Sequence, residues 1–187
     1  MGQSASLGTS SLTGAVEELY QEYLDLSEDL GNRSPSSLSA LNRSYHKHLL
    51  VAAASSLEQQ VKTIIPQIFE RHGREFIGEF VAKAVLARGY HLLFDWKNGT
   101  AASFFANFGP ECRRHFKAKL ESDDELRNQH DAFMTLGARR NDVVHNDYAT
   151  YLIELTPHEV IIKYRLGHAF IQRIEDLILD SVSAFED

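Results

Sequence analysis

The sequence predicts an all-α fold, a helical bundle with additional short helices. Apolar residues recur at intervals of three and four over most of the chain, which is the spacing of an amphipathic helix. Helix-start signals lie between these stretches, and the sharpest is Thr156-Pro157-His158-Glu159, a capping Thr with Pro at the first helical position and Glu three residues on. Residues 148–155 alternate weakly, as a connector or a strand-like stretch would. No internal repeat occurs, so one bundle is expected.

Two long helices are expected in the N-terminal part of the chain. The first covers residues 11–30, and the segment 31–35 ends it, because its glycine suits a left-handed cap and its proline cannot continue the helix. The second begins at residue 36 or 37 and continues through residue 68. Pro66 is expected to kink this helix or to end it early.

Shorter helices are expected in the middle of the chain. After a break at residues 71–73, helical spacing returns in residues 74–87, and the aromatic stretch 89–99 ends in the turn signal Asn98-Gly99. Thr100 is placed to cap a short helix. That helix carries three aromatic residues: Phe104, Phe105 and Phe108. Aromatic residues at such spacing favour a core role over a base-stacking platform.

Three further helix starts follow. Gly109-Pro110-Glu111 opens a short helix, and Ser122-Asp123-Asp124-Glu125 opens a longer one whose acids suit the positive end of the helix dipole. The longer helix is expected to end at about Asn146. The signal at Thr156 opens a single final helix that reaches Val182.

Length and composition fit one domain of ordinary size. We assign residues 1–10 to a flexible N-terminal tail and residues 11–187 to a single domain. The tail matches the pattern for myristoylation at Gly2, which has meaning only in a eukaryotic cell. No apolar run is long enough for a transmembrane helix, so no membrane contact is expected. The single cysteine, Cys112, excludes an intramolecular disulfide and fits a reducing cytoplasm.

The net charge of −7 argues against a protein that coats nucleic acid non-specifically. It does not exclude an enzyme with a small, locally basic cleft. One basic cluster is present, and it is either such a patch or a solvated helix face: Arg113, Arg114, His115, Lys117 and Lys119.

The nine histidines do not show the spacing of a metal site. His46 and His48 are two residues apart, which places them on opposite faces of a helix, and neither His-Glu-x-x-His nor Cys-x-x-Cys occurs. A serine nucleophile elbow, a P-loop and Gly-x-Gly-x-x-Gly are absent as well. We therefore expect no metal and no cofactor, and any catalysis is narrowed to metal-independent acid–base chemistry.

Residues 138–147 concentrate groups that could perform such chemistry. Arg140 could bind phosphate, and His145 could transfer protons near neutral pH. Asn141 lies four residues before His145 and shares its helical face, with Arg140 on the flank of that face. Val143 and Val144 point partly elsewhere and are expected to anchor the helix.

Spacing alone does not separate a site from a helix surface. The same spacing occurs at Arg43 and His48, where no polar amide follows the arginine. In the alternative interpretation, His145 complements the dipole at a helix C-terminus and Arg140 pairs with Asp142 or with carboxylates on the side of Glu125.

The segment Arg140-Asn141-Asp142-Val143-Val144-His145-Asn146, late in an all-helical chain, resembles the Arg-(Asn/Asp/His)-x-x-x-His motif of the HEPN superfamily. It is most similar to the stand-alone, defence-associated RiboL-PSP-HEPN-like group. The stretch Ser55–Gln60 resembles the first core helix of that group, and the resemblance covers roughly residues 38–180.

The resemblance implies a homodimeric bundle in which two motifs face each other in one cleft. It implies metal-independent RNA cleavage, in which the ribose 2′-hydroxyl attacks the adjacent phosphate and leaves a 2′,3′-cyclic end. His145 would then be the general acid/base, Arg140 would hold the phosphate and Asn141 would orient them. Candidates for supporting roles are Glu58, Asp142 and Tyr148, and candidates for RNA contact are Arg139, Arg113, Arg114 and Lys117. Glu58 is either a buried, paired carboxylate or a residue at the rim, and the rim is favoured.

The resemblance also implies a toxin or anti-phage defence effector, with an antitoxin or a larger defence complex as possible partners. In some HEPN toxins a partner nucleotidyltransferase modifies a tyrosine two residues after the motif histidine. This sequence departs from that pattern, because Asp147 occupies the position and Tyr148 is one residue late. The alternative function is a non-catalytic HEPN-like module for dimerisation or regulation. The acidic composition favours that alternative and the Arg-Asn…His motif opposes it.

Overall fold

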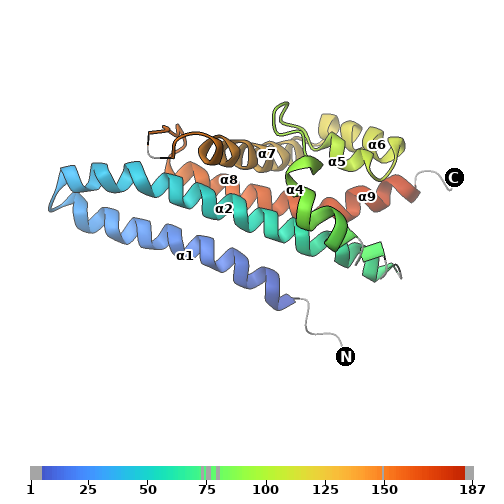
Figure 1. Cartoon of the computed structure of the whole chain (residues 1–187), viewed down its shortest axis with the longest axis horizontal. Helices are drawn as coiled ribbons and strands as arrows, with labels where there is room; N and C mark the ends of the chain where they lie inside the picture. Colours follow the sequence, from blue (N-terminus) through green and yellow to red (C-terminus); the bar gives the residue numbers. More distant parts are fainter. Residues whose placement is uncertain (1–5, 73, 75–76, 79–80, 149, 184–187) are drawn as a thin grey trace.

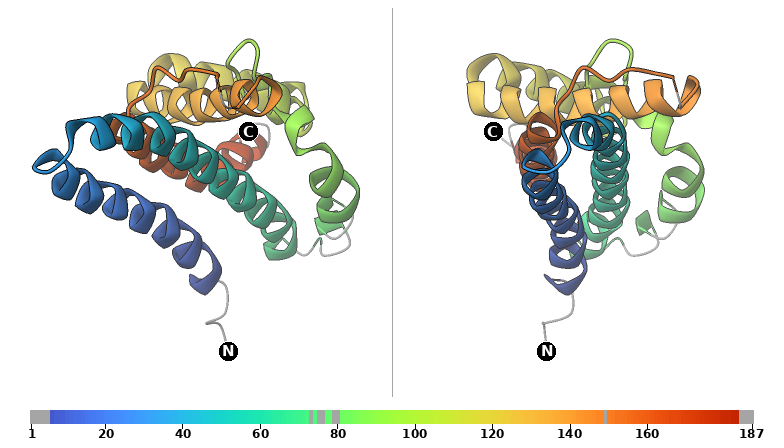
Figure 2. Two further views of the ribbon diagram at one scale, coloured as in Figure 1. Left: turned by 60° about the vertical axis from the view of Figure 1, so that its left-hand side comes forward. Right: turned by 90° about the vertical axis from the view of Figure 1, so that its left-hand side faces the viewer.

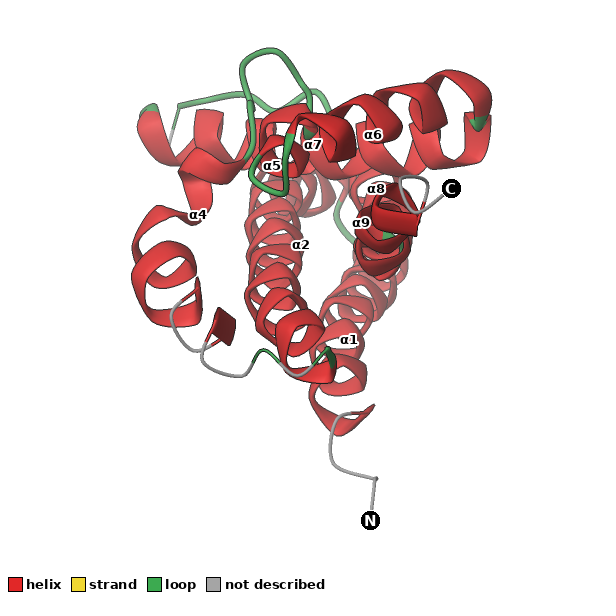
Figure 3. Ribbon diagram, turned by 90° about the vertical axis from the view of Figure 1, so that its right-hand side faces the viewer, coloured by secondary structure: helices red, strands yellow, loops and turns green. Residues whose placement is uncertain are grey.

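The computed structural model describes residues 6–72, 74, 77–78, 81–148 and 150–183. Long helices form a bundle there, and shorter helices pack against one end of it (Figure 1). Within these residues no strand forms, apart from an isolated bridge between Asp95 and Thr100 (Figure 3). The predicted all-α fold is confirmed. Across the same residues, no helix is long and apolar enough to cross a membrane.

The α2 helix is the centre of the bundle, because it contacts α1, α7 and α8 (Figures 1 and 2). The elements in chain order are α1 (Ser6–Gly31), α2 (Pro35–Arg71), the π-helical η1 (Val81–Leu86), α4 (Ala87–Leu93), α5 (Ala102–Ala106), α6 (Pro110–Ser122), α7 (Asp124–His145), α8 (Pro157–Gln172) and α9 (Ile174–Ser183). The π-helical turn and α4 cover part of one side of α2, and α9 packs against α6.

The first two helices differ from prediction at three points. Residues 6–10, assigned to a flexible tail, belong to α1, while Gly2 lies outside the described residues. The α2 helix begins at Pro35, where the side chain of Ser34 accepts a hydrogen bond from the Ser37 amide. Of the two alternatives expected for Pro66, a kink or an early end, the early end is wrong, because α2 continues to Arg71. Pro66 is itself buried, so packing against the core offsets the hydrogen bond that its missing N–H cannot form.

The final segment is two helices rather than one. The break falls at Arg173, whose N–H donates to the Phe170 carbonyl at 3.1 Å in a 3₁₀-type turn. The guanidinium of Arg173 also donates to Asp123 Oδ2 at 2.6 Å. A tertiary ion pair therefore stabilises the break. The predicted capping box at Thr156 is present in full at the start of α8.

The middle of the chain contains the predicted turn and the predicted aromatic core. Gly99 has a φ of +64°, and the Asp95–Thr100 bridge closes the turn around it. Phe104 and Phe105 are buried, which confirms their core role. Of the helix expected over residues 74–87, residues 77–78 are helical and Val81–Leu86 form a π-helical turn, whereas Phe76 and Phe80 lie outside the described residues.

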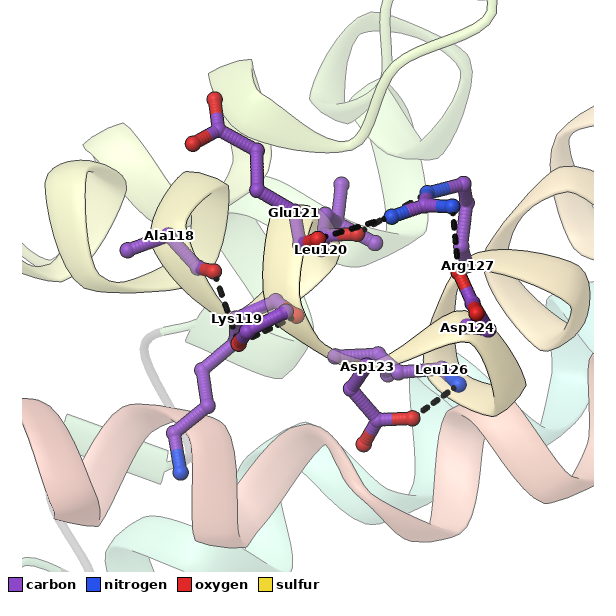
Figure 4. Close-up of polar contacts among 9 residues, drawn as sticks. Ala118, Lys119, Leu120, Glu121, Asp123, Asp124, Leu126 and Arg127 are labelled. Carbon is purple, nitrogen blue, oxygen red and sulfur yellow. Dashed lines mark hydrogen bonds and ion pairs between the residues drawn. The ribbon is translucent and has the colours of Figure 1, made fainter.

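The α6–α7 turn fixes the start of α7 (Figure 4). Asp123 Oδ1 accepts a hydrogen bond from the Leu126 amide at 2.8 Å and so caps α7, within the segment that the sequence predicts as the helix start. Arg127 donates to the carbonyls of Leu120 at 3.0 Å and Glu121 at 2.9 Å. These bonds satisfy carbonyls that the end of α6 would otherwise leave open.

The helices α2, α7 and α8 pack closely together around Gly167 of α8. A Cβ atom at this position would lie 3.0 Å from Leu57 Cδ1 of α2 and 3.3 Å from Phe133 Cα of α7. One helical turn away, the Tyr164 hydroxyl lies 2.9 Å from Ser56 Oγ, so the buried polar groups at this contact are hydrogen-bonded. Packing at this point sets which face of α7 is turned toward α2.

The buried His130 and the half-buried His168 make stability depend on pH. Burial lowers the pKa of His130 below its ordinary value of 6.5, although Asp131 opposes the change. The Nε2 atom of His130 accepts the Ala101 N–H at 3.1 Å, so protonation would also break this hydrogen bond. Burial lowers the pKa of His168 too. Because the unfolded chain takes up these protons at higher pH than the folded chain does, acid favours unfolding.

We predict that the free energy of unfolding falls as the pH is lowered from about 7.5 through 6.5 to about 5.5, where most carboxylates are still ionised. Denaturant titrations at several pH values measure this dependence. His130→Gln should be less stable at every pH and should show a shallower pH dependence. A variant with the same pH dependence as the parent would contradict the assignment to His130.

Candidate active site

A cavity of about 360 Å³ lies between α2, α4 and α7. It contains all three residues that the sequence singles out for catalysis, and Glu58 as well. Its lining is Ala54 and Glu58 from α2, Tyr90 and His91 from α4, Trp96 from the following turn, and Gly137, Arg140, Asn141, Val144 and His145 from α7.

The α7 residues in this lining share one helical face, since they follow one another at intervals of three and four. Asn141 and His145 therefore lie as expected, and Arg140 lies with them. Val143 is completely buried and anchors the helix, as predicted. The same expectation for Val144 is wrong, because its side chain is 51% exposed and lines the cavity beside His145.

Arg140 has no carboxylate partner among the described residues. Its Nη1 atom donates a long hydrogen bond to Asn141 Oδ1 at 3.4 Å, and its buried Nε has no hydrogen-bond partner there. Asp142 pairs instead with Arg139, at 3.3 Å between Oδ2 and Nη1. The alternative in which Arg140 pairs with Asp142 is therefore wrong. A buried guanidinium donor without a partner is suited to an anionic ligand.

Glu58 lines the cavity, where it is half-buried and paired with a lysine. Its Oε1 accepts a hydrogen bond from Lys62 Nζ at 2.5 Å, and its side chain is 25% exposed. Burial raises the pKa of Tyr90, the charge of Glu58 raises it further, and the charge of Arg140 lowers it. Tyr90 thus lies within the field of both charges and stays protonated at neutral pH.

Trp96 forms a wall of the cavity that the sequence analysis did not identify. Its ring lies directly over Gly137, where a Cβ atom would overlap it. Its Nε1 donates to the His91 carbonyl at 3.0 Å, and its ring centroid lies 5.1 Å from that of Phe94. A glycine inside a helical pattern, three residues before Arg140, is the sequence signal that could have indicated this close contact.

The other candidates lie outside this cavity. Arg139 and Asp142 line a second hollow of about 710 Å³ on the other side of Trp96, and Tyr148 lines a third. The basic cluster with Arg113, Arg114 and Lys117 belongs to α6, at the N-terminal end of α7 (Figure 1). His145 is at the opposite end of α7, a helix of 22 residues that is about 33 Å long at 1.5 Å per residue. In the described part of the chain, no group of three His, Cys, Asp or Glu residues is placed to hold a metal ion.

The all-helical architecture of the described residues is that of a HEPN domain. A family model described as RiboL-PSP-HEPN matches residues 15–180, and the chain belongs to this family. The HEPN superfamily is typically associated with nucleases, and its domains bind RNA and often dimerise. No curated protein and no solved structure matches the chain.

We predict that Gly137→Ala displaces the Trp96 ring and opens the cavity wall, because the added methyl group would overlap the ring. Trp96 is the single tryptophan of the chain, so its fluorescence reports the change directly. The emission should shift to longer wavelength and become more accessible to acrylamide.

Gly89→Ala is the matched control, since a Cβ atom there meets nothing within 4 Å. It should leave the fluorescence unchanged and stabilise α4 by up to about 1 kcal/mol. Unchanged emission in Gly137→Ala would contradict the prediction, because it would show that the Trp96 ring keeps its position when residue 137 has a Cβ atom.

Proposed function

We propose that this protein is a metal-independent endoribonuclease that cleaves RNA to a 2′,3′-cyclic phosphate. The observation that carries the proposal is the placement of Arg140, Asn141 and His145 in one cavity, with a buried Arg140 Nε that has no partner among the described residues. Membership of a family associated with nucleases supports the same reaction class.

In the proposed reaction, His145 accepts the proton of a ribose 2′-hydroxyl, and O2′ attacks the adjacent phosphorus. The O2′–P bond forms as the P–O5′ bond breaks, and a protonated imidazole returns a proton to O5′. The guanidinium of Arg140 binds the non-bridging oxygens, where negative charge accumulates in the transition state. Asn141 accepts a hydrogen bond from Arg140 Nη1 and so orients that guanidinium.

Two imidazoles are available if two copies of the chain share one cleft. Exposed apolar side chains around the cavity support such a homodimer. Val144 in the lining is 51% exposed, and Leu92, which follows the lining residue His91 in the chain, is 76% exposed. In the dimer, one His145 would act as the base and the partner's His145 as the acid.

The biological role that fits this activity is a cytoplasmic toxin or anti-phage effector, held in check by an antitoxin or a larger defence complex. The competing candidate is a non-catalytic dimerisation or regulatory module. It is favoured by the Glu58 carboxylate in the lining and by the net charge of −7, which both oppose phosphate binding. The Lys62 ammonium, 2.5 Å from Glu58, reduces the repulsion between the Glu58 carboxylate and a phosphate.

We predict that the purified protein cleaves labelled single-stranded RNA in the presence of EDTA and leaves 2′,3′-cyclic ends. His145→Ala should reduce the rate by about 10² to 10⁴, and Arg140→Ala by about 10² to 10³. Gel electrophoresis of the products measures both the rate and the nature of the ends.

Arg139→Ala is the matched control, because it removes the same charge from the neighbouring residue, which faces the second hollow. Its loss should be far smaller than that of Arg140→Ala. A parent protein that cleaves no RNA would favour the non-catalytic module, and cleavage that survives both substitutions would place the activity elsewhere.

The dimer is tested with Val144→Glu, which places a charge on the exposed apolar surface beside His145. We expect light scattering after size-exclusion chromatography to show a shift from dimer to monomer, with loss of RNA cleavage. Leu26→Glu is the control, because Leu26 is 45% exposed on α1 and lies far along the chain from the cavity residues. A Val144→Glu protein that stays dimeric would contradict this interface.

A further inference from the structure

A shallow hollow of about 270 Å³ lies where α2 meets the segment that follows α7. Its lining contains two cations, a serine hydroxyl and a tyrosine, and no carboxylate: Ala40, Arg43, Ser44, Lys47 and Tyr148. In a chain with a net charge of −7, a lining with two positive charges and no negative one favours an anionic ligand.

Lys47 builds the floor of this hollow. It is only 5% exposed, which is rare for a lysine. Its Nζ donates to the Tyr148 carbonyl at 2.7 Å and lies 5.4 Å from the centroid of the Tyr148 ring. Lys47 therefore ties the segment that follows His145 to α2 and holds the tyrosine in the wall.

Arg43 supplies the hydrogen-bond donors that a ligand in this hollow could use. Its side chain is exposed, and no described residue forms a hydrogen bond or an ion pair with its guanidinium. The neighbouring Ser44 hydroxyl donates to the Ala40 and Leu41 carbonyls, at 3.1 and 3.3 Å, and so has no proton left for a ligand. An anion in the hollow would therefore bind chiefly to Arg43.

The hollow and the candidate active site lie along one face of α2. Lys47, Ala54 and Glu58 are separated by seven and four residues, which places them nearly in line on a helix. Lys47 lines the hollow, whereas Ala54 and Glu58 line the cavity that holds Arg140 and His145. Arg43 lies eleven residues before Ala54, which corresponds to about 16 Å along the helix, a distance that a few nucleotides of a single strand can span.

We propose that this hollow binds a backbone phosphate of single-stranded RNA, two or three nucleotides from the phosphate that is cleaved. Arg43 contacts the phosphate, Lys47 adds positive charge beneath it, and the Tyr148 ring, in a residue that is 50% exposed, offers a surface on which a base stacks. The position of this subsite along the substrate rests on the proposed ribonuclease function, but its affinity for RNA does not.

The first experiment measures binding without cleavage. A fluorescein-labelled RNA of about ten nucleotides is titrated with the His145→Ala protein, alone and with Arg43→Gln added, at several salt concentrations. Arg43→Gln should weaken binding by about tenfold and lower the slope of log K against log salt by about 0.7. Arg33→Gln, which removes an equally exposed arginine from the turn before α2, should have little effect on either quantity.

The second experiment compares two substrates and uses protein that retains His145, with and without Arg43→Gln. The fall in kcat/KM caused by Arg43→Gln should be about tenfold larger on the ten-nucleotide RNA than on a dinucleoside monophosphate, which carries no flanking phosphate. The difference should appear in KM rather than in kcat.

The outcomes separate the subsite from the catalytic proposal. Arg43-dependent binding by a protein that cleaves no RNA would support the subsite and overturn the proposed activity. Binding that Arg43→Gln weakens no more than Arg33→Gln does, or no binding of RNA at all, would overturn the subsite. Equal losses on the two substrates would overturn its position along the strand.

Discussion

The close packing of α2, α7 and α8 at Gly167 determines where the candidate active site lies. Phe133 of α7 occupies the space beside Gly167, so the face of α7 that carries Phe133 is turned into the bundle. Gly137, Arg140 and Val144 follow Phe133 along this same face at intervals of four, three and four residues. The apolar stripe therefore ends at the glycine under Trp96 and gives way to the arginine. Arg140 is partly buried because it continues a core-facing stripe.

The sequence predicts the local features that depend on residues within about one helical turn of each other. The Thr156 capping box acts between residues three apart and is present where the sequence places it, and the predicted helix start at residues 122–125 supplies the Asp123 cap, which acts on an amide three residues away. The break at Arg173 depends on Asp123, fifty residues earlier, and the continuation of α2 past Pro66 depends on core packing. The spacing of Arg140, Asn141 and His145 indicates a shared face, but the Trp96 wall opposite them comes from a turn that periodicity does not place in space.

Two copies of the same arginine–histidine spacing have different surroundings. At the early copy, the His48 ring packs edge-on against Tyr45 at 5.9 Å, while Arg43 faces a hollow that does not include His48. At the late copy, α4 and Trp96 stand across from α7, so Arg140 and His145 line one cavity. Spacing specifies a helical face, and the neighbouring elements decide whether that face is a site. The presence of Asn141 in the sequence favours Arg140 and His145 as the site. The packing of α4 and Trp96 against α7 then encloses them in a cavity.

The buried Nε of Arg140, which has no hydrogen-bond partner among the described residues, is the strongest physical argument that this cavity binds a ligand. A buried donor without an acceptor costs about 1–3 kcal/mol, more when the group is charged. Asp142, which could have satisfied it, pairs with Arg139, and Glu58 pairs with Lys62. Both nearby carboxylates thus have cationic partners of their own, and Asn141 offers Arg140 a bond at 3.4 Å that leaves Nε unsatisfied. A phosphate oxygen in the cavity would supply the missing acceptor and would place its phosphorus beside His145, whose imidazole lines the same space.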